Sequence, residues 1–291
     1  MSGQDAAAGT AGAAGAVEQS LRRRREAGGK SLVPFVTAGI THDWTAYLRA
    51  CADNGADAIE IGLPFSDPML DGPVIQAASG QALGRGVRTA ELLDEVGALD
   101  VGVPLIVMTY SNIVRRQGDQ AFCHRLSAAG ISGLIVPDTP VDEIEPLLSA
   151  ARAGGVELIL LVAPSTRPHR LARIAELCSG FVYAVSNMGV TGLRDAVSDT
   201  VHTTVEAIRQ QTSLPVLVGF GISSPAQAVE VSRHADGVVV ASALMRNVLA
   251  GASAVELGDT VAAYRSALDS VEWRSGADRD RAPAGVVEPG R

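Results

Sequence analysis

The chain has 291 residues and a formal net charge of −8, from 24 Lys and Arg against 32 Asp and Glu. This acidic balance argues against general nucleic-acid binding, which requires a positively charged surface. A hydrophobic content of 47% is ample for a buried core. No apolar run is long enough to span a membrane, and the N-terminus lacks the pattern of a secretory signal. We therefore expect a globular, cytoplasmic protein.

The two ends of the chain differ in composition from its middle. Residues 1–13 are rich in Ala and Gly, and residues 273–291 are polar with Pro and Gly, so both are predicted to be disordered tails. Residues 14–272 are predicted to form one domain that begins with a short helix over about residues 14–27. Residues 22–25 of this helix are all arginine. We interpret them as a solvated helix face rather than a nucleic-acid patch, because no aromatic residues interleave.

Eight short apolar runs alternate with amphipathic stretches along the middle of the chain. Such runs are typical of strands buried on both faces of a parallel sheet. They begin at Leu32, Asp57, Pro104, Ser132, Val156, Phe181, Pro215 and Asp236. Helical patterns between them include residues 90–99, 142–154 and 225–235. This rhythm predicts an α/β fold, a (β/α)8 TIM barrel. An open doubly wound sheet is the alternative, but no GxGxxG follows the first run.

The spacing of the apolar runs indicates where a functional site lies. Most runs start 21 to 28 residues after the previous one, but the second interval takes 47 residues and the sixth takes 34. Long connections in compact domains are usually functional. Because barrel active sites lie on loops after the C-terminal ends of strands, we expect the site to use the loops after the second and sixth runs.

The second run and its loop supply two carboxyl groups. Glu60 lies inside the apolar run DAIEI, one residue before its end. Apolar surroundings raise a carboxyl pKa and suit the group to acid–base catalysis; a salt bridge at the barrel rim is the structural alternative. Asp71 follows in a loop with three prolines. It is the better second carboxylate, because turn formation explains Asp67 nearly as well as function does.

Glycine-rich turns follow the sixth and seventh runs, and a serine follows the eighth. The residues concerned are Gly189, Thr191, Gly192, Gly219, Gly221, Ser223, Ser224 and Ser242. Ser223 or Ser224 begins a helix at Pro225, and Ser242 is predicted to cap a helix that begins at once. Turns of this kind beside a helix N-terminus predict a phosphate site built from backbone N–H groups.

The remaining reactive residues limit the chemistry further. Lys30 is the single lysine, and it precedes the first strand, at the opposite end of the barrel from the loops above, so a Schiff-base mechanism is not expected. No pair of the five histidines has the spacing of metal ligands. Cys51, Cys123 and Cys178 form no CxxC pair and are expected to be buried free thiols. We therefore expect neither a cofactor nor a metal.

The segment IEIGLPFSDPMLDGP, with LVPFVTAG, MTYSN, GVTG and GFGIS in this order, closely resembles the tryptophan synthase α subunit. The resemblance runs over about residues 31–248. It implies a (β/α)8 barrel that cleaves indole-3-glycerol phosphate to indole and glyceraldehyde 3-phosphate in a retro-aldol reaction, a lyase step of tryptophan biosynthesis. It also implies a partner, the pyridoxal-phosphate β subunit, which receives the indole within an α2β2 complex.

The resemblance also implies roles for individual residues. Glu60 matches the general acid/base, and Asp71 matches the aspartate that hydrogen-bonds the indole N–H. The other matches are Phe35, Tyr110, Tyr183 and Thr191 for substrate binding, Gly192, Gly221, Ala241 and Ser242 for phosphate binding, and Pro64, Asp67 and Asn112 for contact with the β subunit. Ala241 departs from the family, in which glycine is usual at this position.

Three other functions stay open at this point. One is a lyase of the same chemistry that works alone and releases free indole. The second is a barrel without activity that only activates a β subunit, and the presence of Glu60 and Asp71 counts against it. The third is a barrel isomerase acting on a sugar phosphate, which the PFSDP and DGP motifs count against. A response to a β subunit separates the first from the main interpretation.

Overall fold

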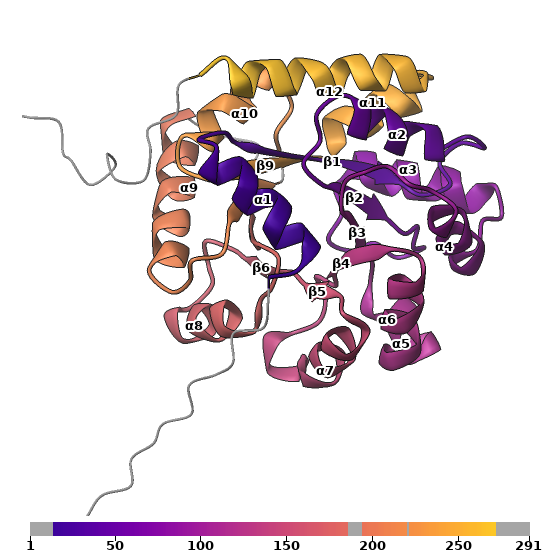
Figure 1. Cartoon of the computed structure of the whole chain (residues 1–291), viewed down its shortest axis with the longest axis horizontal. Coiled ribbons are helices and arrows are strands. Elements are labelled where there is room, and N and C mark those ends of the chain that lie inside the picture. Colours follow the sequence, from indigo (N-terminus) through magenta and orange to yellow (C-terminus); the bar gives the residue numbers. More distant parts are fainter. Residues whose placement is uncertain (1–13, 186–193, 220, 272–291) are drawn as a thin grey trace, which may run out of the picture.

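The computed structural model describes residues 14–185, 194–219 and 221–271. Strands and helices alternate along these residues, and the outer helices surround a central ring of strands (Figure 1). The order and pairing of the strands make this ring a (β/α)8 barrel, as predicted. The two predicted tails, residues 1–13 and 273–291, lie outside the described residues.

All the strand pairs in the described sheet are parallel. The strands are β1 (Ser31–Thr37), β2 (Ile59–Gly62), β3 (Leu105–Met108), β4 (Ile131–Ile135), β5 (Glu157–Leu158), β6 (Leu160–Val162), β7 (Val182–Val185), β8 (Val216–Gly219) and β9 (Gly237–Val240). Their order in the sheet is β5-β4-β3-β2-β1-β9-β8-β7-β6. Because β5 and β6 are pieces of one strand separated by Ile159, the segments correspond to the predicted apolar runs and the ring closes.

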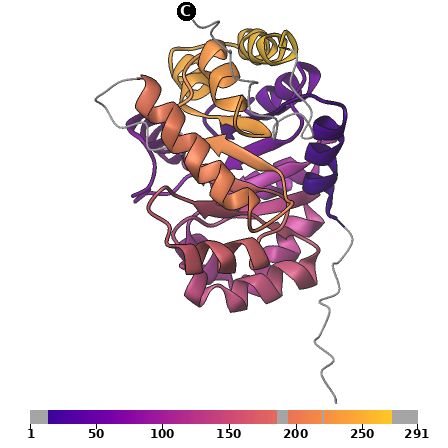
Figure 2. The ribbon, with the colours of Figure 1, turned by 90° about the vertical axis from the view of Figure 1, so that its left-hand side faces the viewer.

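Apart from α1, which precedes β1, the described helices follow strands in the sequence and cover the outside of the barrel (Figure 2). They are α1 (Ala16–Glu26), α2 (Thr45–Asp53), α3 (Pro73–Gly84), α4 (Thr89–Gly97), α5 (Ser111–Gln117), α6 (Asp119–Ala128), the 3-10 turn η1 (Val141–Glu143), α7 (Glu145–Gly154), α8 (Pro168–Leu177), α9 (Arg194–Arg209), α10 (Pro225–Ser232), α11 (Ser242–Leu249) and α12 (Ala254–Asp269). The helical patterns predicted from the sequence correspond to α1, α4, α7 and α10, with ends that differ by up to three residues.

The strands form the core, and their burial matches their apolar sequences. Every residue of β1, β2, β3, β8 and β9 is buried. Lys30 is also buried, and its ammonium group donates a hydrogen bond to the Ala235 carbonyl at 2.6 Å, at the N-terminal end of the barrel. The three cysteines are buried free thiols. Among the described helices, none combines the length and apolar character needed to cross a bilayer.

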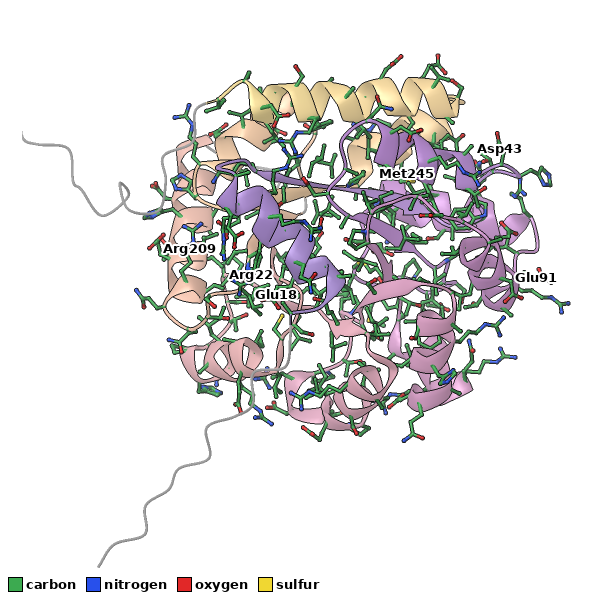
Figure 3. The ribbon with its side chains drawn as sticks, viewed as in Figure 1. Glu18, Arg22, Asp43, Glu91, Arg209 and Met245 are labelled. Carbon is green, nitrogen blue, oxygen red and sulfur yellow. The ribbon has the colours of Figure 1, made fainter. Side chains whose placement is uncertain are left out.

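Helix α1 lies across the N-terminal end of the barrel, in front of the strands in Figure 1. Its first backbone N–H groups, from Val17 and Glu18, donate hydrogen bonds to the buried Glu157 carboxylate of β5 at 2.7 and 3.0 Å. On the same helix, Arg22 and Glu18 form an ion pair at 2.6 Å (Figure 3). A carboxylate from the barrel therefore caps this helix, which has no side-chain cap of its own.

The arginine run of α1 is solvated only in part. Arg23 is exposed, as predicted, but Arg24 and Arg25 are half-buried and reach the barrel, so the prediction of a solvated face is wrong for these two. Arg24 pairs with Asp57 at 2.8 Å, and Arg25 lies 3.8 Å from Asp236. Both aspartates are buried beside the starts of strands, where the side chain of Asp57 also accepts the Leu32 N–H at 2.8 Å. These two arginines therefore hold α1 against the barrel. The partners lie at least 33 residues away in the chain, so a local reading could not find them.

Candidate active site

A cavity of about 380 Å³ lies at the C-terminal ends of β1, β2, β3, β7, β8 and β9. Its volume suits a small organic ligand. The lining residues are Phe35, Glu60, Asp71, Gly72, Pro73, Ile75, Met108, Tyr183, Gly221, Ile222, Val239, Ala241 and Ser242. Seven of them are residues that the sequence singled out. The fold therefore brings both candidate carboxyl groups, two aromatic rings and the described turns at Gly221 and Ser242 to one place.

Glu60 is a buried acid with apolar neighbours. Strand β2 sets it in register between Phe35 of β1 and Ile106 of β3. The residue is 1% exposed, and its Oε2 atom has no hydrogen-bond partner among the described residues. None of the ion pairs in the described part of the chain involves Glu60. Burial, and then the charge of Asp71, raise the pKa of Glu60 to about 8, so it is mostly protonated at neutral pH.

Asp71 lies at the end of the loop between β2 and α3, and Tyr110 holds this loop in place. The Tyr110 hydroxyl accepts the Leu70 N–H at 3.1 Å and hydrogen-bonds the Asp71 carboxyl group. The Tyr110 ring stacks on Phe65 with 5.2 Å between centroids. Burial raises the pKa of Asp71 to about 6, although the hydrogen bond from Tyr110 lowers it. Tyr110 is thus placed behind Asp71 and is not among the residues that line the cavity.

Two glycines make room for the aromatic walls of the cavity. A Cβ atom on Gly219 of β8 would lie within 2.5 Å of the Tyr183 ring, and one on Gly62 of β2 would lie within 2.7 Å of two carbon atoms of the Phe35 ring. Neither ring could keep its position beside a larger residue. Burial, and then the two nearby carboxyl groups, raise the pKa of Tyr183 well above its usual value. Its hydroxyl group therefore stays protonated.

The glycine-rich end of the cavity is formed by the turns after β8 and β9. Gly221 has a φ of +82°, which favours glycine. Ser224 caps α10 by accepting the Gln227 N–H at 3.3 Å, as predicted. The prediction that Ser242 caps α11 is wrong, because Ser242 is already the first helical residue and Ala241 is the N-cap, without a side-chain cap. The first-turn N–H groups of α11 therefore have no side-chain cap, and the residues that begin this helix, Ala241 and Ser242, line the cavity.

The residues predicted to contact a partner differ in exposure. Asp67 and Asn112 are exposed, whereas Pro64 is buried and has no surface to offer a partner in this structure. The same loop exposes two large apolar side chains, since Met69 is 75% and Leu70 is 45% exposed. Sequence reasoning did not single out Met69 or Leu70. The available signal was this apolar pair inside the polar turn segment SDPMLDG.

Sequence reasoning also missed the apolar part of the cavity wall. Ile75, Met108, Ile222 and Val239 line it, and each is buried. Met108 is the last residue of β3 and Val239 the last but one of β9, and both strands are continuous apolar runs. Such runs do not show which residues face inward, because both faces of the strand are buried. Three residues that the sequence singled out, Gly189, Thr191 and Gly192, lie outside the described residues.

The chain is similar to known proteins over most of its length. The family model described as tryptophan synthase alpha chain matches residues 21–268. The chain belongs to this family. The tryptophan synthase alpha chain of Gloeobacter violaceus is 48% identical over 244 residues, 82% of this chain and 87% of that protein. The one from Halorhodospira halophila is 42% identical over 262 residues, 87% of this chain and 96% of that protein.

Solved tryptophan synthase structures share the fold as well as the sequence. The structure of Mycobacterium tuberculosis tryptophan synthase in space group F222 has a TM-score of 0.81 at 37% identity and covers 88% of this chain and 98% of that chain. The tryptophan synthase alpha subunit of Legionella pneumophila has a TM-score of 0.81 at 30% identity, over 89% of this chain and 100% of that chain. The barrel therefore agrees with experimental structures of its family.

Membership in the tryptophan synthase alpha family defines the reaction class. The chain is a carbon–carbon lyase that cleaves indole-3-glycerol phosphate, in the alpha-subunit role of tryptophan biosynthesis. The resemblance found in the sequence is thereby confirmed. The sugar-phosphate isomerase, the alternative that shared only the phosphate turns, is set aside.

Proposed function

We propose that Glu60 and Asp71 carry out this cleavage as a pair in opposite protonation states. The observation that carries the proposal is the burial of Glu60 beside Asp71 in one cavity, with pKa values raised to about 8 and about 6. Near neutral pH, this leaves a carboxylic acid next to a carboxylate. Environments that separate two carboxyl pKa values in this way assign one group to proton donation and the other to charge stabilisation.

The proposed reaction begins with proton transfer from Glu60 to indole C3. The ring becomes an indolenine with positive charge near N1, which the Asp71 carboxylate offsets. The Glu60 carboxylate then removes the proton of the glycerol hydroxyl group next to the ring. The bond between C3 and the glycerol carbon breaks, its electron pair restores the indole ring, and the glycerol part leaves as the aldehyde. Glu60 ends protonated, so atoms and electrons balance without a co-reactant.

We also propose an orientation for the substrate in the cavity. The indole ring lies between Phe35 and Tyr183, beside the two carboxyl groups. The phosphate lies at the other end, on the turn at Gly221 and the first turn of α11 at Ala241 and Ser242. This is supported by the start of α11, whose N–H groups have no side-chain cap and favour an anion. Thr191 and Gly192 are proposed to complete the phosphate and lid side.

We further propose that the loop between β2 and α3 binds a tryptophan synthase β subunit in an α2β2 complex. Met69 and Leu70 expose apolar side chains beside the charged Asp67, a composition that suits a protein interface. Leu70 is tied through Tyr110 to Asp71. A partner that orders this loop would therefore also order the Asp71 carboxylate, as a population shift toward the active arrangement.

The pH dependence of kcat/KM for indole release tests the paired carboxyl groups. Glu60 must be protonated and Asp71 ionised, so activity is lost below about pH 6 and above about pH 8, the pKa values of the two groups. Glu60→Gln should lose the general acid–base contribution, about 10²–10⁴-fold in rate. Asp71→Asn should retain binding, slow turnover and move the alkaline limb to lower pH, because its charge raises the pKa of Glu60. A Glu60→Gln variant with more than about a tenth of wild-type turnover contradicts the assignment.

Titration of the lyase rate with a purified β subunit tests the proposed partner. We expect a rise of at least tenfold, equivalent to about 1.4 kcal/mol on the barrier. Asp67→Ala should weaken this activation much more than it lowers the rate of the chain alone. A high basal rate that does not respond to the β subunit indicates a stand-alone lyase. A chain that raises the β-subunit rate but releases no indole by itself or in the complex indicates a silent barrel.

A further inference from the structure

The barrel closes through the pairing of β4 with β5, but this pairing does not continue from β4 to β6, and we call this gap at the C-terminal end the seam. The ladder between β4 and the fifth strand position ends with the Ile159 N–H, which donates to the Leu134 carbonyl at 2.9 Å. Alternate residues of a parallel strand bond to opposite neighbours, so the next rung would join the Leu161 N–H to the Val136 carbonyl. That carbonyl instead accepts the Thr139 N–H at 3.2 Å, in the turn after β4. No described residue accepts the Leu161 N–H toward this side.

A cavity of about 550 Å³ fills this seam at the C-terminal face of the barrel. The lining residues are Val136, Pro137, Thr139, Val141, Ile144, Ile159, Leu160, Leu161, Ser165, Thr166, Arg167, His169, Arg170 and Ile174. None of them lines the cavity that holds Glu60 and Asp71. The two cavities thus share no lining residue among those described, and no residue that lines the larger one has a role in the proposed lyase reaction.

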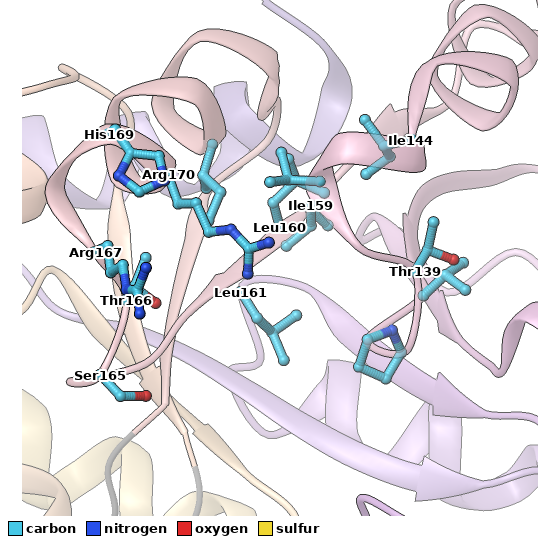
Figure 4. Close-up of a pocket in the computed structure, with 14 residues that line it drawn as sticks. Thr139, Ile144, Ile159, Leu160, Leu161, Ser165, Thr166, Arg167, His169 and Arg170 are labelled. Atoms are coloured by element: carbon cyan, nitrogen blue, oxygen red, sulfur yellow. The ribbon is translucent and has the colours of Figure 1, made fainter.

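The seam cavity has an apolar floor and a cationic side. Ile144, Leu160 and Ile174 are all buried and form part of the floor. In Figure 4, the Arg167 and His169 side chains at the start of α8 lie on one side of the cavity and Ile144 lies on the other. No Asp or Glu is among the described residues that line it.

The cationic side keeps one guanidinium group without an acidic partner. Arg170 is paired with Asp142 at 2.7 Å, and both side chains are more than half exposed. Arg167 makes no ion pair with any described residue. The start of α8 adds the positive end of a helix dipole. Arg167, the start of α8 and Leu161 all line this one cavity, so its charged side favours an anion.

We propose that the seam cavity binds an organic anion with an apolar body. The apolar body packs on Ile144, Leu160 and Ile174, and the carboxylate or phosphate group lies between Arg167, His169 and the unpaired Leu161 N–H. Small-ligand sites combine an apolar lining with a few convergent polar groups, and their volumes of roughly 300–1,000 Å³ include this one. The anion accepts the hydrogen bond from the Leu161 N–H that the Val136 carbonyl would accept if the strand ladder continued.

Calorimetric titration of the full-length chain with three naphthyl probes tests the site. The probes are 2-naphthoate, 2-naphthyl phosphate and the uncharged 2-naphthamide, so the first two distinguish a carboxylate from a phosphate ligand. Arg167→Gln should weaken binding of the preferred anion at least tenfold. Arg173→Gln is the matched control, because Arg173 lies on α8 outside the cavity and pairs with Glu145 and Glu176; it should change binding less than twofold.

A second variant keeps the test decisive if Arg167→Gln folds poorly. Ser165 is exposed on the cavity rim, so Ser165→Glu should be tolerated and should also weaken the anion at least tenfold. Three results overturn the proposal. They are the absence of binding by both anions at millimolar concentration, equal affinity for the amide and the anions, and equal responses of the Arg167 and Arg173 variants.

Discussion

Replacing Gly219 with alanine tests whether the position of the Tyr183 ring controls catalysis. The new Cβ atom would lie within 2.5 Å of two ring carbons and closer still to the Tyr183 hydroxyl oxygen, whereas ordinary contact begins at 3.4 Å, so the ring must withdraw by at least about 0.9 Å. A misplacement of about 1 Å in a catalytic constellation can cost about 10²-fold in rate. Overpacking of a core costs about 1–3 kcal/mol. We expect kcat for indole release to fall about 100-fold, while the chain still folds.

The matched control for this prediction is Gly80→Ala. Gly80 lies within α3, and a Cβ atom there meets nothing within 4 Å. Alanine in a helix interior is favoured over glycine by about 0.5–1 kcal/mol, so this variant should keep its turnover and gain stability in urea denaturation. If Gly219→Ala keeps a turnover within about threefold of wild type, the ring position does not limit the reaction and the reasoning is refuted.

Two further predictions concern the contact of Tyr110 with Asp71 and the ion pair of Arg265 with Asp57. Tyr110→Phe removes the hydrogen bond that lowers the pKa of Asp71, so the acid limb of the kcat/KM profile should move to higher pH; an unmoved limb contradicts this. Arg265→Met leaves the buried Asp57 without one of its partners and should lower the free energy of unfolding in urea by about 3 kcal/mol. Arg23→Met, exposed and outside the ion pairs of the described chain, should change it by less than about 0.5 kcal/mol.

The barrel could be predicted because its signals are local. Each strand is a short apolar run, and the regular spacing of these runs indicates repeated strand–helix units. Glu60 could be found for the same reason, since a carboxylate within a buried strand requires an explanation. The raised pKa expected for Glu60 agrees with its burial in the structure. The proline-rich loop likewise marked Asp71, which lies in the same cavity.

The features that could not be predicted depend on contacts between distant segments. The arginines of α1 looked solvated because their partners, Asp57 and Asp236, come much later in the chain. Pro64 belongs to a loop with exposed tips, and its burial depends on how that loop folds back. The break at Ile159 lies inside a continuous apolar run, VELILLV. The ladder ends there because the Val136 carbonyl accepts the Thr139 N–H in the turn after β4. The apolar pattern of one strand cannot predict a hydrogen bond made by another segment.

The contacts of α1 have a consequence for the order in which the molecule assembles. This helix is near the start of the chain, yet its N-terminal cap is Glu157, 140 residues from Val17, and Arg25 pairs with Asp236. Contacts so distant in sequence carry a high loop-closure cost and slow folding. During synthesis from the N-terminus, α1 leaves the ribosome with an apolar face, including Val17 and Leu21, that has no barrel to cover it. Its docking on the barrel can be completed only after the segment with Asp236 has been synthesised. Helix α1 is therefore synthesised before the barrel but docks on it late in folding.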